Sequence, residues 1–384
     1  MCIRDSHHAI AAYFKQFRGF SARADFDGGR RSGKGKVVKP RVGAKRNGKE
    51  GVSEILVGNA VEVLKEIPSD SVDMCVTSPP YYGLRDYGEK GQYGIERTPQ
   101  EYIDHLTLVF HEVKRVLKPD GTLWLNIGDS YAGSGKGPMS KARAGNGKNN
   151  KLYQKDSRIY EVPKVWDGIK PKDLIGIPWL LAFALRTDGW YLRSDIIWHK
   201  LNCLPESTKD RPTKCHEYIF LLSKSPKYYY DYKAIQEPLK QVSIDRYKRG
   251  RSDNSKYYGK KNDLLQNINR PHDDFSKFDQ KYRRKRDVWE VSTNNYKMDE
   301  HFAMYPEKLI EPCILAGSRI GGTVLDPFFG SGTTGAAAKR LGREYIGIDI
   351  NARYCEKARQ RIAGVVPQLD SSSAAGEGKR DVCQ

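Results

Sequence analysis

The chain has 384 residues, of which 38% are hydrophobic and 29% charged, and 66 Lys and Arg against 47 Asp and Glu give a formal net charge of +19. The longest apolar run covers 11 residues (175–185), whereas a membrane-spanning helix needs about 20, so such a span is excluded. The positive charge favours a polyanionic partner such as nucleic acid, although a generally basic protein would show the same balance.

Short apolar strands alternate with helical stretches over most of the chain. We predict strands at 72–77, 122–127, 191–198, 217–223, 323–326 and 345–350, and helices at 102–117, 178–187, 306–316, 333–341 and 352–362. The first strand, Val-Asp-Met-Cys-Val-Thr, is almost continuously apolar, which is typical of a strand buried on both faces. The alternation predicts an α/β fold with a doubly wound, mostly parallel sheet that helices cover on both sides.

Basic residues gather in two segments outside these elements. Residues 1–50 contain 13 Lys and Arg and 4 Asp and Glu, with many glycines and no sustained apolar periodicity, which predicts a disordered basic arm. Residues 240–286 contain 15 basic and 6 acidic residues interleaved with aromatic residues and Asn. This mixture suits contacts to the phosphates and base edges of DNA, and a solvated linker is the alternative.

The cysteines and the N-terminus point to the cytoplasm. The seven cysteines are spread along the chain without a Cys-x-x-Cys pair, at positions 2, 75, 203, 215, 313, 355 and 383. Their odd number and dispersion predict a reducing cytosol rather than a disulfide-stapled scaffold, and the N-terminus lacks the apolar segment of a signal peptide. His199, Cys203, Cys215 and His216 fit no common zinc-finger spacing. We therefore predict no metal site.

A glycine-rich turn follows the predicted strand at 323–326. The sequence Gly330-Ser-Gly332-Thr-Thr-Gly335 leads into the next helix, and glycines allow the backbone to turn tightly and lie against a ligand. Asp349 ends the following strand, 23 residues after Asp326. A carboxylate there can accept hydrogen bonds from both hydroxyls of a ribose. The pattern predicts a site for an adenosine-containing cofactor.

The turn differs from two common nucleotide motifs. Its glycines formally fit the dinucleotide pattern Gly-x-Gly-x-x-Gly, but Asp-Pro-Phe-Phe (326–329) separates them from the strand, and no second nucleotide-binding half follows. The Walker pattern does not occur in this segment. An NAD-dependent oxidoreductase is therefore disfavoured, and a turn without a ligand is the other alternative.

A second candidate motif, Ser78-Pro79-Pro80-Tyr81, directly follows the strand at 72–77. The two prolines fix φ and remove two N–H donors, so the turn is stiff and presents carbonyl oxygens. The Ser78 hydroxyl and the Pro79 carbonyl can hold an exocyclic amino group by its hydrogens, which directs the nitrogen lone pair toward a methyl sulfonium. Tyr81 offers a face on which a base taken out of the duplex can stack. A proline-stiffened surface turn is the alternative.

The two motifs resemble those of the S-adenosylmethionine-dependent DNA methyltransferases that methylate exocyclic amines. Their order is that of the permuted β group, in which the catalytic motif comes first, the target-recognition region follows and the cofactor motif comes last. The resemblance covers about residues 55–362 and includes matches at 128–130, 195–205, 216–220 and 304–309. It implies a circularly permuted, Rossmann-like methyltransferase fold.

Composition, for the arm and the tail, and the resemblance, for the parts between them, predict how the chain is divided. Residues 1–52 form the basic arm, 53–230 the catalytic half of the core, 231–300 the inserted target-recognition region, 301–363 the cofactor-binding half, and 364–384 a disordered tail.

Roles for particular residues follow from the same resemblance. The target base would be received by Ser78, Pro79, Pro80 and Tyr81. The cofactor would be bound by Asn59, Asp326, Pro327, Phe328, Phe329, Gly330, Ser331, Gly332, Thr333 and Asp349. Within this set, Phe329, Gly330 and Gly332 would line the methionine part, Asp326 would lie near its amino end, and Asp349 would bind the ribose.

One position departs from the family pattern, and the DNA contacts rest on less specific features. Asn59 stands where the family commonly has Asp beside the adenine, which predicts weaker cofactor binding or altered geometry rather than loss of function.

We expect DNA contacts from Lys200, Asn202, Tyr257, Tyr258, Arg283 and Arg284. For Lys200 and Asn202, a polar pair at the edge of the sheet is the alternative.

The implied function is a site-specific DNA methyltransferase that acts on double-stranded DNA, in a bacterium or a phage, by base flipping and direct transfer. In this family Ser at the first motif position is usual for cytosine-N4 enzymes and Asp or Asn for adenine-N6 enzymes, so we favour cytosine N4 and keep adenine N6 as the alternative. A catalytically silent DNA-binding protein is a more distant one. A C5 mechanism is disfavoured because Cys75 lies inside the strand.

Partners are less well determined by the sequence. A restriction–modification system would add a cognate endonuclease. Protein-glutamine methyltransferases share the chemistry, but they resemble Asn-Pro-Pro-Tyr enzymes in which the glycine motif comes first. The sequence leaves the recognised DNA site and the oligomeric state open.

Overall fold

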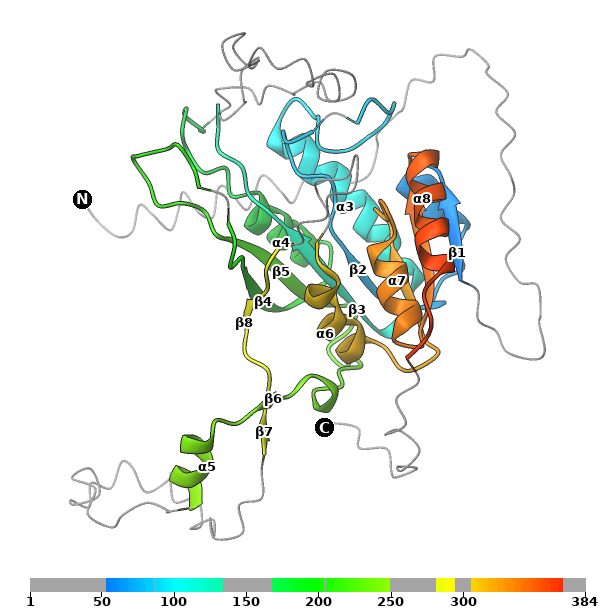
Figure 1. Ribbon diagram of the computed structural model, residues 1–384. Coiled ribbons are helices and arrows are strands. Elements are labelled where there is room, and N and C mark those ends of the chain that lie inside the picture. Colours follow the sequence, from blue (N-terminus) through cyan, green and yellow to red (C-terminus); the bar gives the residue numbers. More distant parts are fainter. Residues whose placement is uncertain are drawn as a thin grey trace, which may run out of the picture. The chain divides into compact units, whose positions relative to one another are not determined.

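The computed structural model describes residues 53–85, 87–133, 168–203, 205–248, 281–293 and 305–368, with the backbone alone for 246–248. Within this part, an eight-stranded sheet has the order β1-β10-β9-β2-β3-β5-β4-β8, and β6 pairs with β7 (Figure 1). The strands are β1 (Glu54–Val57), β2 (Val72–Thr77), β3 (Leu117–Ile127), β4 (Tyr191–His199), β5 (His216–Ser223), β6 (Glu237–Pro238), β7 (Tyr282–Arg283), β8 (Val288–Glu290), β9 (Thr323–Asp326) and β10 (Glu344–Asp349).

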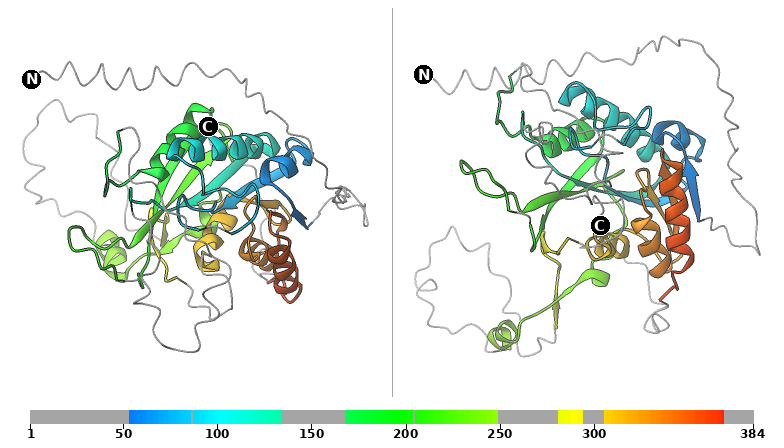
Figure 2. Two further views of the ribbon diagram at one scale, coloured as in Figure 1. Left: turned by 90° about the horizontal axis from the view of Figure 1, so that it is seen from above. Right: turned by 45° about the horizontal axis from the view of Figure 1, so that its top comes forward.

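The helices lie on both sides of this sheet. They are α2 (Ala60–Glu66), α3 (Pro99–Val116), α4 (Ile177–Thr187), α5 (Gln241–Lys248), α6 (Glu307–Gly317), α7 (Thr333–Arg340) and α8 (Ala352–Ala363), with a 3₁₀ turn η3 (Lys233–Ile235). Helices α2, α3 and α4 cover one face, and α6, α7 and α8 cover the other (Figure 2). Strand β2 is buried along its whole length, because Cys75 packs into the first layer while Met74 and Val76 pack into the second.

The sheet is mostly parallel, which confirms the predicted fold class. Strands β1, β10, β9, β2 and β3 run parallel to one another. Strand β5 is antiparallel to both β3 and β4, a reversal that the alternation of strands and helices does not reveal. Its cause is the connection from β4 to β5, which contains no helix and therefore joins the two strands as a hairpin.

Element boundaries depart most from the prediction around α3. The helix begins earlier than predicted, because the Thr98 hydroxyl accepts a hydrogen bond of 3.1 Å from the Glu101 N–H and Pro99 occupies the first turn. The strand predicted at 122–127 also begins earlier, because Lys-Pro-Asp-Gly (118–121) belongs to β3. Strand β3 starts at Leu117, which pairs with Val72 of β2.

Several short elements escaped the sequence prediction, and some predictions lie outside the described residues. Strand β1 is four residues long and pairs with β10 from the other end of the chain, so no local sequence pattern predicts it. The predicted arm at 1–52 and the tail from residue 369 onward lie outside the described part. None of the described helices has the length and apolar character needed to cross a membrane.

Two leucines of α3 provide a matched test of this packing. Leu106 is 0% exposed in the layer between α3 and the sheet, whereas Leu108, two residues on, is 59% exposed. We expect Leu106→Ala to lower the free energy of unfolding by about 2–5 kcal/mol and Leu108→Ala to change it by less than about 0.5 kcal/mol. Urea denaturation of the two variants measures the difference. Equal losses would contradict the assigned face of the helix.

Candidate active site

The strands that carry the two predicted motifs are neighbours in the sheet. Strands β2 and β9 run parallel, with Met74 opposite Val324 and Cys75 opposite Leu325. Because the carboxyl ends of adjacent parallel strands lie at the same edge, the turns that follow them start side by side. The Thr77 hydroxyl, just before Ser78, donates a hydrogen bond of 2.6 Å to Oδ1 of Asp326.

Asp326 ties the glycine turn to its surroundings. Its Oδ2 accepts hydrogen bonds from the hydroxyls of Thr334 (2.5 Å) and Tyr305 (3.0 Å), and its Oδ1 also accepts the Phe328 N–H (3.0 Å). The side chain is 1% exposed, and burial raises its pKa against the opposing effect of these hydrogen bonds. Asp326 therefore fixes the turn from within, and its contact with a cofactor amino group stays a prediction.

Both turns open into one cavity of about 1300 Å³. The predicted residues that line it are Asn59, Ser78, Pro79, Pro80, Tyr81, Lys200, Asn202, Asp326, Pro327, Phe328, Phe329, Gly330, Ser331, Thr333 and Asp349. Single ligand pockets usually measure about 300–1,000 Å³, so this cavity has room for two ligands side by side. The structure thus brings the predicted catalytic and cofactor residues to one place.

The first two glycines of the turn serve different purposes. Gly330 has φ of 51°, and a Cβ built on it meets nothing within 4 Å, so this residue faces open space in the cavity. Gly332 has φ of 81° and does not line the cavity. A Cβ there would lie 2.8 Å from the Cβ of Ala358 in α8. Gly332 is therefore required by the start of α7 and its packing against α8, and its contact with a cofactor stays a prediction.

The two phenylalanines of the turn also differ. Phe329 is 3% exposed, its ring stacks on Tyr345 with centroids 6.0 Å apart, and a Cβ on Gly347 would come within 2.4 Å of that ring. The ring of Phe328 meets Tyr93 edge-on at 5.6 Å. Phe329 thus fastens the turn to β10, while Phe328 and Tyr93 contribute aromatic surface to the cavity wall.

Asp349 stands at the end of β10 and faces the glycine turn. Its Oδ2 accepts the Gly330 N–H at 2.7 Å, and its Oδ1 accepts the Asn351 N–H at 2.8 Å. Burial raises the pKa of this carboxyl to about 6. Each oxygen of a carboxylate offers two lone pairs, so one backbone donor on each leaves acceptor sites for ligand hydroxyls.

The side-chain amide of Asn59 makes two hydrogen bonds within the protein. Its Oδ1 accepts the Val61 N–H at 3.0 Å and so caps α2, while its Nδ2 donates to the Gly91 carbonyl at 3.4 Å. A carboxylate could cap the helix but could not donate to Gly91. The departure from the family pattern therefore has a local physical reason.

A cavity wall that the sequence did not predict comes from the segment after the catalytic motif. Leu84, Arg85, Tyr87, Gly91, Gln92 and Tyr93 line the cavity. Gln92 holds the segment in shape, because its Oε1 accepts the N–H of Tyr87 (2.8 Å) and its Nε2 donates to the Arg85 carbonyl (3.2 Å). The only sequence signal is the density of Gly and Tyr between 81 and 94.

Charged residues from the β4–β5 connection and from the start of β5 were not expected at the cavity. Arg211, Lys214 and Glu217 line the cavity, and none of them was predicted as a site residue. Burial lowers the pKa of Lys214, an effect that the nearby Asp129 and Glu217 carboxylates oppose. The guanidinium of Arg211 lies 3.9 Å from the ring centroid of Tyr131 and pairs with Glu206.

Lys200 and Asn202, which the sequence assigned to DNA, make internal contacts in the structure. The Lys200 ammonium pairs with Glu217. Asn202 accepts hydrogen bonds from the N–H (2.7 Å) and the hydroxyl (3.0 Å) of Thr293 and donates to its carbonyl (3.1 Å). Their engagement by other residues matches the alternative of a structural polar pair, and any contact with DNA stays a prediction.

The other predicted DNA contacts belong to the basic segment. Arg283 pairs with Glu237 at 3.2 Å, and the guanidinium of Arg284 lies 5.3 Å from the ring centroid of Tyr232. Tyr257 and Tyr258 lie outside the described residues.

The structure corrects one expectation about the cysteines. Cys203 and Cys215 form a disulfide across the β4–β5 connection, with their Cα atoms 5.3 Å apart. The hairpin brings together two residues whose spacing in the sequence gives no sign of pairing. Cys75, Cys313 and Cys355 are free and buried. Over the described ranges, no group of three or more His, Cys, Asp or Glu is placed to hold a metal ion.

Comparison with known proteins decides the family. The model of the N6/N4 methyltransferase family, described as DNA methylase, matches residues 72–360. The chain belongs to the N6/N4 DNA methylase family. The catalytic motif precedes the cofactor motif in this DNA amino-methyltransferase, so the predicted β-group resemblance is confirmed.

Similar proteins include type II methyltransferases and one solved structure. The chain is 47% identical to M.SmaI of Serratia marcescens over 309 residues. This alignment covers 80% of this chain and 90% of that protein. The chain is 44% identical over 308 residues to M.Cfr9I of Citrobacter freundii, with 80% and 86% covered. The structure of the cytosine-N4-specific PvuII DNA methyltransferase aligns with a TM-score of 0.52 at 18% identity, over 81% of this chain and 86% of that one, which shows a shared fold.

Asp349 gives this methyltransferase a predictable pH dependence. Its carboxyl titrates at about 6 in the folded protein against an ordinary value of 3.8, so between these values the folded state holds a proton that the unfolded state has released. The free energy of unfolding contributed by Asp349 therefore falls as the pH rises from about 4 to about 6, by roughly 1–3 kcal/mol.

Urea denaturation across this pH range should show the fall in the wild type and its loss in Asp349→Asn. Asp104→Asn removes an exposed carboxylate of α3 and should keep the wild-type dependence. Identical pH profiles for the wild type and Asp349→Asn would contradict the assignment.

Proposed function

We propose that this methyltransferase transfers a methyl group from S-adenosylmethionine to the N4 amine of cytosine in double-stranded DNA. The observation that supports it most directly is that Ser78 and Pro79 line the same cavity as Gly330 and Asp349. A site for an exocyclic amine and a site for an adenosine-containing cofactor are then parts of one space.

The residues around Gly330 fit this cofactor. The Asp349 carboxylate keeps acceptor sites for the two ribose hydroxyls, and Gly330 leaves room for a ligand to approach the backbone. Phe328 and Tyr93 provide aromatic surface for an adenine, which Asn59 borders. When bound, S-adenosylmethionine supplies a sulfonium methyl group, whose carbon–sulfur bond breaks as the new carbon–nitrogen bond forms.

The chain's own residues hold the amine that receives the methyl group. In this mechanism the Ser78 hydroxyl oxygen and the Pro79 carbonyl each accept one N–H of the amine, so its lone pair points away from them. The adjacent prolines keep these acceptors in place because they fix the backbone φ. One of the two N–H protons passes to water after transfer, which restores a neutral amine. Neither a covalent enzyme intermediate nor a metal is part of the proposal.

The choice of base rests on Ser78. Within the family that the chain resembles, Ser at this position is usual for cytosine-N4 enzymes, whereas Asp or Asn is usual for adenine-N6 enzymes. A flipped cytosine would lie against the Tyr81 ring, at the same turn as the two acceptors.

DNA binding and biological context complete the proposal. Four basic residues line the cavity, and two of them are paired, Lys200 with Glu217 and Arg211 with Glu206. The other two, Arg85 and Lys214, would offer positive charge to the phosphates of the substrate. The 231–300 segment, with Tyr257, Tyr258, Arg283 and Arg284, is assigned to recognition of the DNA sequence. We place the enzyme in the cytoplasm of a bacterium, as the protective half of a restriction–modification system with a cognate endonuclease.

The base and the recognised site can be read in one experiment. DNA from bacterial cells that lack other methylation and express the chain should contain N4-methylcytosine, detected by mass spectrometry of its nucleosides. Methylome sequencing should place the mark at one short sequence. DNA from cells that express Ser78→Ala should contain far less of it. N6-methyladenine instead would overturn the assigned base, and unmethylated DNA would overturn the proposed activity.

Stacking on Tyr81 predicts a graded effect of two substitutions. Tyr81→Ala should weaken the capture of the target base by about 1–3 kcal/mol, or roughly 5–150-fold in kcat/KM for DNA, whereas Tyr81→Phe keeps the ring and should lose less. Tyr191→Ala removes a tyrosine that is 44% exposed at the start of β4, and it serves as the control. Wild-type turnover in Tyr81→Ala would count against stacking.

A further inference from the structure

We propose that Glu217 is a positioning residue, which accepts the hydrogen bond of the Tyr81 hydroxyl and thereby holds the Tyr81 ring at the angle needed to stack the target base. This inference rests on the proposed function. It assigns a role to a charged side chain that the sequence prediction passed over, on a strand distant in sequence from the catalytic motif.

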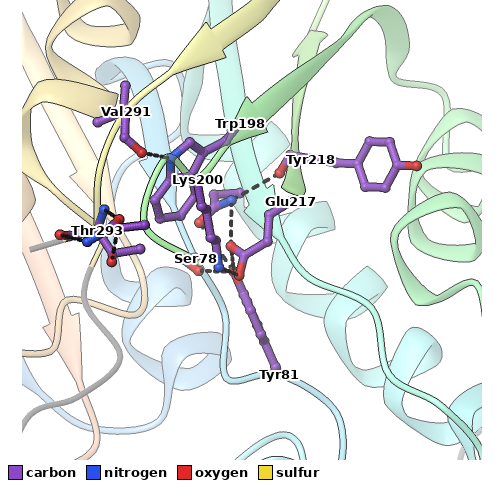
Figure 3. Close-up of polar contacts among 10 residues, drawn as sticks. Ser78, Tyr81, Trp198, Lys200, Glu217, Tyr218, Val291 and Thr293 are labelled. Carbon is purple, nitrogen blue, oxygen red and sulfur yellow. Dashed lines mark hydrogen bonds and ion pairs between the residues drawn. The ribbon is translucent and has the colours of Figure 1, made fainter. Parts of the chain in front are cut away.

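The Tyr81 ring is held at its edge and at its hydroxyl. A Cβ on Gly128, the residue after β3, would come within 2.6 Å of Cε2 of Tyr81, so the ring edge packs directly on that backbone. The hydroxyl donates a hydrogen bond of 2.6 Å to Oε2 of Glu217 and lies 3.3 Å from Oδ1 of Asn126 (Figure 3). Burial and the Glu217 carboxylate raise the pKa of Tyr81, so the hydroxyl keeps its proton as a donor.

The surroundings of Glu217 show that it acts through its neighbours. Its side chain is 13% exposed, and a carboxylate buried to this degree is costly unless it is paired. It receives hydrogen bonds from Tyr81 (2.6 Å) and from Nδ2 of Asn126 (3.4 Å), and its other oxygen pairs with the Lys200 ammonium. The direct hydrogen bond from the Tyr81 hydroxyl and the Lys200 ion pair that holds the other oxygen suit Glu217 to orienting Tyr81.

Lys200 connects this arrangement to the core of the sheet. Its ammonium lies 4.7 Å from the ring centroid of Trp198, and the Trp198 Nε1–H donates to the Val291 carbonyl at 2.8 Å. Figure 3 shows these side chains converging from β4, β5 and the segment after β8. Lys200 thus neutralises Glu217 and restricts its side chain. The hydrogen bond from the Tyr81 hydroxyl to Glu217 in turn restricts the Tyr81 ring.

A purely structural role of the ion pair makes a different prediction from a positioning role. Gln at position 217 can still accept the Tyr81 hydrogen bond but cannot neutralise Lys200, whereas Leu can do neither. If pairing with Lys200 is what matters, Glu217→Gln and Glu217→Leu should be equally impaired. If positioning of Tyr81 matters, Gln should rescue much of what Leu loses.

The test measures single-turnover methyl transfer on a duplex that carries the recognised site, together with the binding of S-adenosylmethionine. We expect Glu217→Leu to reduce the transfer rate by no more than Tyr81→Ala does, within the range of roughly 5–150-fold, and Glu217→Gln to retain at least three times the rate of Glu217→Leu. Both should bind S-adenosylmethionine within about twofold of the wild type. In the Tyr81→Phe background, which has no hydroxyl to hold, the two substitutions should differ by less than threefold.

A second measurement follows the base itself. A fluorescent cytosine analogue at the target position should report stacking on Tyr81, and its quenching should be weakened in Glu217→Leu and largely restored in Glu217→Gln. This readout remains informative if a variant is less stable, because it is taken on folded protein that binds S-adenosylmethionine. Glu290→Leu, which removes a carboxylate 66% exposed on neighbouring β8, should behave as the wild type in both assays.

The outcomes separate the two proposals. Equal rates for Glu217→Leu and Glu217→Gln, or the same ratio between them with and without the Tyr81 hydroxyl, would overturn the positioning role while the methyltransferase assignment stands. A wild-type protein that forms no N4-methylcytosine would overturn the proposed function instead.

Discussion

The site depends on two parallel strands, β2 and β9, that lie next to each other and end at the same edge of the sheet. The hydrogen bond from Thr77 to the buried Asp326 links the last residues of the two strands, from which the two turns start. Because Asp326 also accepts from Thr334, Tyr305 and the Phe328 N–H, one carboxylate fixes the last residue before the catalytic motif and the first residues of the glycine turn. A shift of either strand would separate the two halves of the cavity.

Charge is distributed unevenly around this shared cavity. Asp326 and Asp349 stand at the glycine turn, where the proposed cofactor carries a positive sulfonium and an amino group. Arg85 and Lys214 line the same cavity from other segments and would meet the phosphates of the proposed substrate. Lys200 and Arg211 also line it, but they are paired with Glu217 and Glu206. Acidic groups at the glycine turn and basic groups elsewhere would suit two unlike ligands in one space.

Local patterns predicted much of the fold and the loop chemistry. The buried strand at 72–77, the helix starting at 333 and the turn between 326 and 335 were read from continuous apolar runs, helical periodicity and glycine spacing, which act over a few residues. The direction of β5 and the pairing of β1 with β10 were not, because both depend on where distant segments lie. The Cys203–Cys215 disulfide was not predicted for the same reason, because only the β4–β5 hairpin brings its two cysteines together.

The sequence by itself determined which chemistry the chain carries, since the order of Ser78–Tyr81 and the glycine turn indicated both the family and the expected ligands. Only the tertiary structure decided what individual polar side chains do. Gly332 packs against α8, Lys200 pairs with Glu217, and Glu217 meets the Tyr81 hydroxyl. The physical reason is that the role of a polar or small residue is set by the partner it finds in space, and those partners lie far away along the chain.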